Sequence, residues 1–188
     1  MKNLKTIAIT LFVSILALNV SGQTKKIDAG KSKINWVGKK VTGQHEGTVN
    51  FKEGSLLFKA SKLAGGTFTV DMTSLTSTDL TGDYQGKLNG HLKSEDFFGT
   101  EKNPTATLVF KKIAVKSAGV YNVTADLTIK GKTNPVTFEL TVNGNTAATT
   151  FKIDRTKYDI KYGSGSFFDN LGDKAIDNEF ELKVALVF

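Results

Sequence analysis

The chain has 188 residues, of which 39% are hydrophobic and 10% aromatic, so it is long enough to bury a core and reads as one domain. It contains no cysteine, which excludes a disulfide framework and a lipoprotein attachment thiol. The formal net charge is +7, but the lysines are scattered rather than gathered in one block, so we expect no nucleic-acid partner.

The first 22 residues have the pattern of a secretory signal peptide. Lys2 and Lys5 flank the start of an apolar run from Ile7 to Leu18, which is too short for a membrane span, and small residues end the segment at Gly22. We therefore predict cleavage near Gly22, a domain over residues 23–188, and a periplasmic or secreted protein. No integral membrane span is expected in the remainder.

Apolar and polar residues alternate along most of the chain, which is typical of β-strands with one face buried and the other exposed to solvent. The expected strands begin with "KINWVGKK", "GTVNF", "SLLF" and "GTFTVDMT", and continue with "TATLVF" and "VYNVTADLTIK". Two more are joined by Asn143-Gly144, a strong hairpin signal, and "FELKVALVF" closes the chain. We predict an all-β antiparallel meander of about eight strands closed as a barrel, because closure removes exposed edges.

One segment, residues 79–93, has helical spacing instead. Its apolar face carries Leu80, Tyr84, Leu88 and Leu92. Glycines recur at the same spacing, at Gly82, Gly86 and Gly90. Each glycine costs about 1 kcal/mol of helix stability relative to alanine, but it also permits close backbone approach. We predict a short helical cap that lies across the barrel; a helix that plugs one end without any ligand fits the pattern equally well.

Two pairs of phenylalanines lie in segments that read as loops. Phe97 and Phe98 end "GHLKSEDFF", and Phe167 and Phe168 follow "GSGS". Loops run over the surface, where four large apolar rings gain nothing from exposure. We therefore expect both pairs to be buried around a mouth of the barrel, by the cap or by a ligand.

Catalytic chemistry is hard to assemble from this sequence. The only histidines, His45 and His91, are far apart, so we expect no metal site. His91, Ser94 and Asp96 include the residue types of a hydrolytic triad, but a triad needs groups brought from separate elements. A polar lid or a headgroup contact is the favoured role of this segment.

Arg155 follows a clean strand and should lie at the barrel rim. Its guanidinium offers a planar fork of donors suited to phosphate or carboxylate. The alternative is a structural ion pair with Asp154 or Asp159 that fixes the rim.

Three segments resemble the signature segments of the YceI-like family: "GHLKSEDFFGTEKNPTATLVF", "ADLTIKGKTNPVTFEL" and "FKIDRTKYDIKYGSGSFF". The segments "WVGKKVTGQHEGTVNF" and "GGTFTVDMTSL" are similar to its N-terminal half, so the resemblance covers nearly all of residues 27–188. It implies an exported, lipocalin-like antiparallel barrel that holds a polyisoprenoid or related long-chain amphiphile in its lumen. It implies a binding protein without a cofactor, not an enzyme.

Combining the resemblance with the strand pattern gives a set of expected ligand contacts. The apolar contacts of lumen and mouth are Trp36, Phe68, Phe97, Phe98, Phe110, Phe138, Phe151, Phe167 and Phe168. The headgroup candidates are His91, Lys93 and Arg155. The periodicity does not separate a ligand-filled lumen from a solid core, since both need an inward apolar face.

Two other functions are compatible with the sequence, an outer-membrane barrel and an enzyme. A homodimer is also compatible with it. The closing strand, with its terminal Phe188, resembles that of an outer-membrane barrel, although one Trp, four Tyr and several short expected strands count against it. An enzyme acting on a lipid or isoprenoid would need a nucleophile or an acid inside the lumen.

Overall fold

The computed structural model describes residues 22–188, so the predicted signal segment lies outside the described residues except for Gly22. The strands within this range are β1 (Gln23–Lys26), β2 (Lys33–Lys40), β3 (Gly43–Lys59), β4 (Lys62–Ser77), β5 (Thr105–Ser117), β6 (Val120–Ile129), β7 (Lys132–Asn143), β8 (Thr146–Asp154) and β9 (Ile176–Val187). The helices are α1 (Gly82–Lys93) and two short 3-10 turns, η1 (Arg155–Tyr158) and η2 (Gly172–Lys174).

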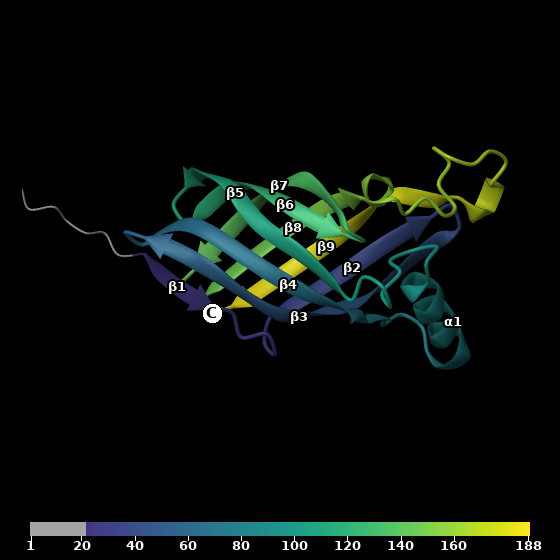
Figure 1. The fold of residues 1–188 in the computed structure, drawn as a ribbon, viewed down its shortest axis with the longest axis horizontal. Helices are drawn as coiled ribbons and strands as arrows, with labels where there is room; N and C mark the ends of the chain where they lie inside the picture. Colours follow the sequence, from purple (N-terminus) through teal and green to yellow (C-terminus); the bar gives the residue numbers. More distant parts are fainter. Residues whose placement is uncertain (1–21) are drawn as a thin grey trace, which may run out of the picture.

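Strands β2 to β9 form a closed antiparallel barrel, which confirms the predicted fold class (Figure 1). The order is β3-β2-β9-β8-β7-β6-β5-β4, and the pairing of β3 with β4 closes the circle. β1 pairs with the second half of β3, whereas β2 pairs with its first half, so β1 and β2 share one edge of β3. Side chains that alternate along each strand therefore face a single enclosed core.

The strands are longer than the sequence patterns indicated. The segments expected as separate strands, "GTVNF" and "SLLF", belong to the 17-residue strand β3, and the shortest barrel strand, β2, has 8 residues. β3 stays continuous because its pairing with β4 absorbs register shifts at three places, including Phe51/Glu53. Gly54 fits this crowded stretch, since a Cβ there would lie 2.4 Å from Cδ1 of Phe68.

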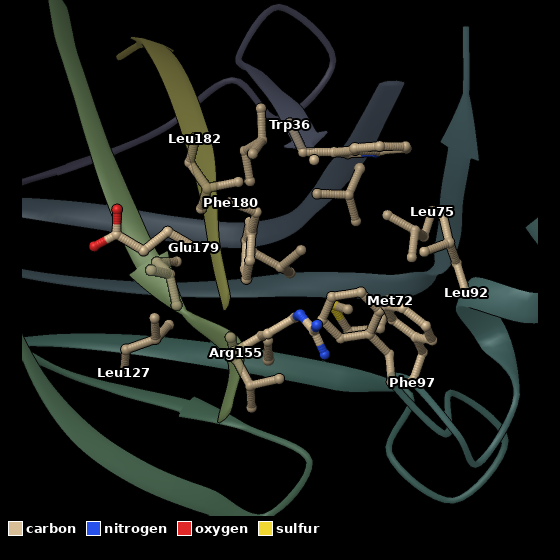
Figure 2. A pocket seen from close by; sticks show the side chains of 18 of the residues that line it. Trp36, Met72, Leu75, Leu92, Phe97, Leu127, Arg155, Glu179, Phe180 and Leu182 are labelled. Atoms are coloured by element: carbon tan, nitrogen blue, oxygen red, sulfur yellow. The ribbon is translucent and has the colours of Figure 1, made fainter. Parts of the chain in front are cut away.

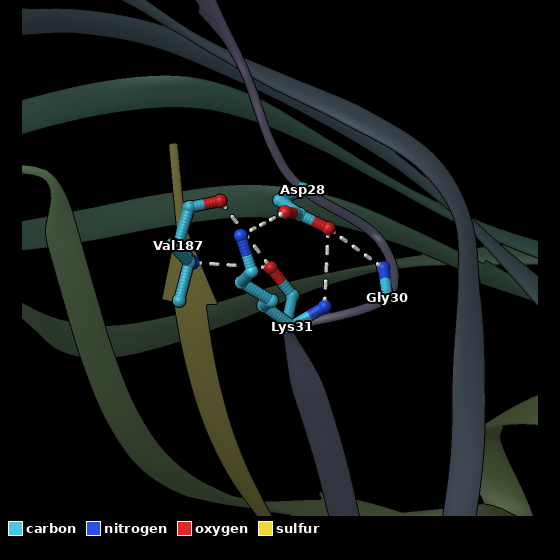
Figure 3. A network of polar contacts seen from close by, with 5 residues as sticks. Asp28, Gly30, Lys31 and Val187 are labelled. Atoms are coloured by element: carbon cyan, nitrogen blue, oxygen red, sulfur yellow. Dashed lines mark hydrogen bonds and ion pairs between the residues drawn. The ribbon is translucent and has the colours of Figure 1, made fainter.

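The two ends of the barrel differ. α1 and the loop that follows β8 lie at one end, and β1 and the C-terminus lie toward the other (Figure 1). There the turn before β2 is tied to the end of β9: the N–H of Asp28 donates to the carbonyl of Val187 over 2.7 Å, and Ser32 Oγ accepts the Val187 N–H over 3.1 Å. Asp28 Oδ1 also accepts the N–H groups of Gly30 and Lys31, so the turn is rigidly organised (Figure 3).

The helix α1 is held to the barrel by polar contacts. Ser77 at the end of β4 donates its N–H to Asn89 Oδ1 over 2.8 Å and accepts from Gln85 Nε2 over 2.8 Å. The expected close approach of the glycine stripe is wrong: a Cβ added at Gly86 or Gly90 would meet nothing within 4 Å, because these positions face away from the barrel. Within residues 22–188, no helix is long and apolar enough to cross a membrane.

Candidate functional site: an apolar lumen with a buried arginine

The barrel interior contains two adjacent apolar cavities. One of about 140 Å³ lies toward the α1 end, and one of about 70 Å³ lies deeper; we call them the upper and the lower cavity. Both are lined by Ile34, Val70, Leu127 and Leu182. The two cavities therefore share four aliphatic side chains of the barrel wall.

Trp36 forms one wall of the upper cavity (Figure 2). Its indole N–H donates to the carbonyl of Thr48 over 3.3 Å. The ring lies against Gly47, where a Cβ would come within 2.5 Å of Trp36 Cζ2, so a side chain at Gly47 would displace the indole. The chain's single tryptophan is thus fixed in the lumen wall.

Arg155 is the buried cation of the upper cavity, only 3% exposed. Its guanidinium donates three hydrogen bonds to backbone carbonyls: Nε to Asp177 over 2.9 Å, Nη1 to Ile160 over 2.8 Å and Nη2 to Ile176 over 3.0 Å. Burial lowers the pKa of Arg155 from its usual value, and the nearby charges of Asp154 and Asp177 oppose this shift. A guanidinium has five N–H donors, so two remain beyond these three bonds.

The alternative role of Arg155, a structural ion pair with Asp154 or Asp159, is not what the structure shows. Asp154 caps η1 by accepting the N–H of Thr156 over 3.0 Å and its hydroxyl over 2.6 Å. Asp159 pairs instead with Lys161 over 2.8 Å. The positive charge of Arg155 is therefore held by carbonyl dipoles at the lumen wall.

Phe97 closes the α1 end of the upper cavity and is 6% exposed. Its ring centroid lies 4.9 Å from that of His91, 5.7 Å from Tyr162 and 6.3 Å from Phe98. These side chains come from α1, from the loop after it and from the loop after β8, so Phe97 joins three segments at the mouth. We refer to the four rings as the mouth cluster.

The expected contact residues separate into three groups. Trp36, Phe97, Phe98 and Arg155 line the upper cavity, and Phe68, Phe110, Phe138 and Phe151 line the lower cavity. His91, Lys93, Phe167 and Phe168 line neither cavity. His91 belongs to the mouth cluster, where its ring contacts Phe97 and Tyr162, but it does not line the cavity.

The second phenylalanine pair is not buried as expected. Phe167 is 49% exposed and Phe168 is 50% exposed. Both backbone N–H groups donate to the carbonyl of Ser164, over 3.0 Å each, in a turn anchored by the 2.6 Å hydrogen bond from Ser164 Oγ to Asn178. This turn holds the pair outside the lumen, so only Phe97 and Phe98 face the cavity.

Several lining residues were missed from the sequence. The upper cavity is also lined by Met72, Leu75, Ile153, Asp177, Glu179 and Phe180. Phe180 and Leu182 alternate with polar residues along β9, so this pattern could have assigned Phe180 to the inner face. No sequence signal distinguishes Asp177 and Glu179 at the rim from ordinary surface acids.

The residues weighed for catalysis or metal binding have other contacts in the structure. The Ser94 hydroxyl donates to the backbone carbonyl of His91 over 2.8 Å, so it is not directed at the imidazole as a nucleophile would be. His45 Nδ1 lies 2.7 Å from Asp79 Oδ2. Burial alone would raise the pKa of Asp79, but the hydrogen bonds from His45 and from the Glu46 N–H have the larger effect, so the pKa of Asp79 is lowered. Across residues 22–188, no three His, Cys, Asp or Glu residues are grouped to hold a metal ion.

Comparison with known proteins agrees with this architecture. The family model of the YceI-like domain matches residues 26–188. Protein YceI of Escherichia coli O6:H1 is 37% identical over 111 residues, which cover 50% of this chain and 55% of that protein. A UPF0312 protein of Shewanella denitrificans is 33% identical over 91 residues, 48% of this chain and 46% of its own length. The chain spans about half the length of the curated relatives it matches.

Solved structures share the fold. The crystal structure of BcnA from Burkholderia cenocepacia has a TM-score of 0.69 and 30% identity, covering 86% of this chain and 99% of that one. A polyisoprenoid binding domain from Saccharophagus degradans, implicated in plant cell wall breakdown, has a TM-score of 0.57 and 17% identity, with coverages of 86% and 95%. At this identity the second likeness concerns the fold alone.

Proposed function

This chain belongs to the YceI-like family, and on that premise we propose that its barrel binds the chain of a polyisoprenoid or a similar long-chain amphiphile in the lumen. The observation that carries the proposal is the pair of adjacent apolar cavities that ends at the buried Arg155. The Saccharophagus degradans neighbour, described as a polyisoprenoid binding domain, supports the ligand class.

The cavity volumes favour a thin and flexible ligand. A cavity of about 150 Å³ with apolar walls accepts a molecule the size of benzene, so the upper cavity alone holds only a fragment of a lipid. A longer chain must occupy both cavities and move the aliphatic side chains that line both of them. A methyl-branched or linear hydrocarbon can do this stepwise, whereas a rigid polycyclic ligand cannot.

Arg155 is the candidate contact for a polar head. It lies at the end of the upper cavity near the mouth cluster and keeps two N–H donors beyond its three carbonyl bonds. The negative charges of Asp154 and Asp177 lie near Arg155 and weaken its attraction for an anion. The site therefore suits a neutral hydroxyl as well as a phosphate.

We propose that the protein is exported and sequesters or carries its ligand in water, without acting on it as an enzyme. Cross-strand ion pairs on the barrel, such as Lys111 with Asp126 and Lys152 with Glu179, each at 3.3 Å, support a water-exposed exterior. Charges facing lipid would be costly, which counts against the outer-membrane alternative.

The test is extraction of the native protein, followed by mass spectrometry of what is released, with a lumen-filling variant beside it. Ala106 is buried and lines the upper cavity, so Ala106→Phe should occupy the space that the ligand needs. Val109→Phe, on the same strand but 37% exposed, is the matched control. We expect a long-chain lipid from the parent and from Val109→Phe, and little or none from Ala106→Phe. Equal recovery of lipid from both variants, or none from the parent after reconstitution with polyprenol, would refute the proposal.

A further inference from the structure

The barrel wall is weakly closed between β7 and β8. These strands pair at only three positions, Thr141 with Ala148, Val142 with Ala147 and Asn143 with Thr146. By contrast, β8 pairs with β9 along its whole length, from Thr146 to Asp154. Both β7 and β8 continue beyond the last pair, to Lys132 and Asp154, without a shared ladder. We refer to this unpaired stretch as the seam.

Side chains close the seam in place of backbone hydrogen bonds. Continuing the antiparallel register beyond Thr141 and Ala148 puts Phe138 opposite Phe151, and their rings stack with centroids 4.7 Å apart and planes at 22°. At the far end, Asn134 Nδ2 donates to the carbonyl of Lys157 over 2.9 Å. Because no backbone ladder joins β7 and β8 along this stretch, moving the two rings apart breaks no ladder hydrogen bond.

An outer groove lies beside the seam, lined by residues of β7, β8 and β9. The groove has a volume of about 380 Å³ and polar lining residues that include Glu139, Thr150 and Lys183. Thr149 and Val184 line both the groove and the lower cavity. These two residues are opposite each other in the β8–β9 ladder, so the groove and the lower cavity meet beside the seam.

Thr149 is an unusual residue for its position. It is the one polar residue that lines the lower cavity, and its hydroxyl is buried without a hydrogen-bond partner within the described chain. A buried hydroxyl without a partner is costly, whereas a ligand hydroxyl or carbonyl beside it would satisfy it. The seam thus contains a polar contact point next to an apolar cavity.

We propose that the seam between β7 and β8 is a lateral passage through which a long-chain amphiphile reaches the lower cavity, with Thr149 bonding its hydroxyl or carbonyl group. This inference rests on the proposed lipid-binding function, but it adds a second route that is separate from the mouth cluster. The chain slides between Phe138 and Phe151, and the polar group stays at the groove, where Thr150 and Lys183 face water.

A reversible engineered disulfide across the seam tests the passage. The described chain has no cysteine, so Glu139→Cys with Thr150→Cys places a single pair across the seam. The control, Thr150→Cys with Lys183→Cys, links β8 to β9 by a disulfide at two residues that are already opposite each other in the paired ladder. The probe is a dibrominated octadecanol, whose binding and release are followed by quenching of Trp36. We expect oxidation of the seam pair to slow exchange by about tenfold and reduction to restore it, with no change in the control.

A second comparison covers the case in which the seam disulfide does not form. Phe151→Ala removes a ring of the seam, and Phe68→Ala removes a lower-cavity ring on β4, so both enlarge the lumen. Faster exchange in Phe151→Ala than in Phe68→Ala supports the passage. Equal rates in this pair, or equal rates in the oxidised and reduced seam variant, overturn it. Equilibrium quenching in the parent separately tests the proposed function.

Discussion

The guanidinium of Arg155 lies over the ring of Phe97, with its central carbon 5.7 Å from the ring centroid. Arg155 begins η1 at the end of β8, whereas Phe97 belongs to the loop after α1, so this contact joins the barrel wall to the mouth cluster. Cations attract the faces of aromatic rings most strongly where water is excluded. The residue offered for the polar head is therefore also part of the structure that closes the lumen.

Replacing Arg155 with Met should affect both stability and headgroup preference. Three backbone carbonyls lose their donor, which should lower the free energy of unfolding by about 1 to 3 kcal/mol. Affinity for a polyprenyl phosphate should fall by more than affinity for the polyprenol, by a further 1.5 to 3 kcal/mol or so, typical of a charge-assisted hydrogen bond. Arg155→Lys keeps the charge and is the control. Equal losses for phosphate and alcohol would show that Arg155 is structural only.

The two phenylalanine pairs should respond differently to substitution. Phe97→Ala removes a buried ring and should destabilise the protein by about 3 kcal/mol or more and weaken lipid binding. Phe167→Ser with Phe168→Ser removes half-exposed rings and should change the free energy of unfolding by less than about 1 kcal/mol. Urea unfolding and lipid titration measure both effects. Loss of binding in the Phe167 and Phe168 variant with unchanged stability would give the exposed pair a role in ligand capture.

Two glycines of α1 should respond in opposite directions. Gly86 has open space around it, so Gly86→Ala should raise the stability of the helix by up to about 1 kcal/mol. Gly82 has φ of +57°, a conformation that alanine adopts with strain, so Gly82→Ala should loosen the start of the helix. If α1 gates the mouth, Gly86→Ala slows lipid exchange and Gly82→Ala accelerates it. Identical exchange rates in the two variants would assign α1 a passive role.

Tyr158 should destabilise the protein at high pH. It is 1% exposed, its hydroxyl has no hydrogen-bond partner in the described chain, and burial raises its pKa to about 12. In the unfolded chain the Tyr158 hydroxyl ionises near pH 10. The free energy of unfolding is therefore unaffected by this group below pH 10 and falls as the pH rises from 10 toward 12. Tyr158→Phe should remove this loss and be neutral or stabilising at pH 7, since it deletes an unpaired buried hydroxyl. A parent and variant with the same alkaline stability profile would contradict this assignment.

The fold was largely predictable because the inward residues of a barrel follow a period of two, and Phe68, Phe110, Phe138 and Phe151 all lie on strands with that period. The loops were not predictable in the same way. Phe97 and Phe167 have the same local sequence signal, but the turn anchored by Ser164 directs the second pair outward. Long-range hydrogen bonding determined that outcome.

The polar contacts of the site were also only partly predictable from the sequence. Arg155 was identifiable from its place at a strand end, but its partners are carbonyls of residues 160, 176 and 177, which only the closed barrel brings together. Thr149 gave no signal, since a threonine at an inward position of a strand is common and its missing partner is a property of the packed lumen. The pairing of β7 and β8 ends at Thr141, and the sequence signal for this was Pro135, which has no backbone N–H to donate and lies in the unpaired part of β7.

Quenching of the single tryptophan tests the central claim most directly. Trp36 lines the upper cavity, so a polyprenol brominated along its chain can quench it only on close contact. We predict saturable quenching with one lipid per chain, abolished in Ala106→Phe and retained in Val109→Phe. Bound lipid that leaves the fluorescence of Trp36 unchanged, or quenching that persists in Ala106→Phe, would contradict binding in the lumen.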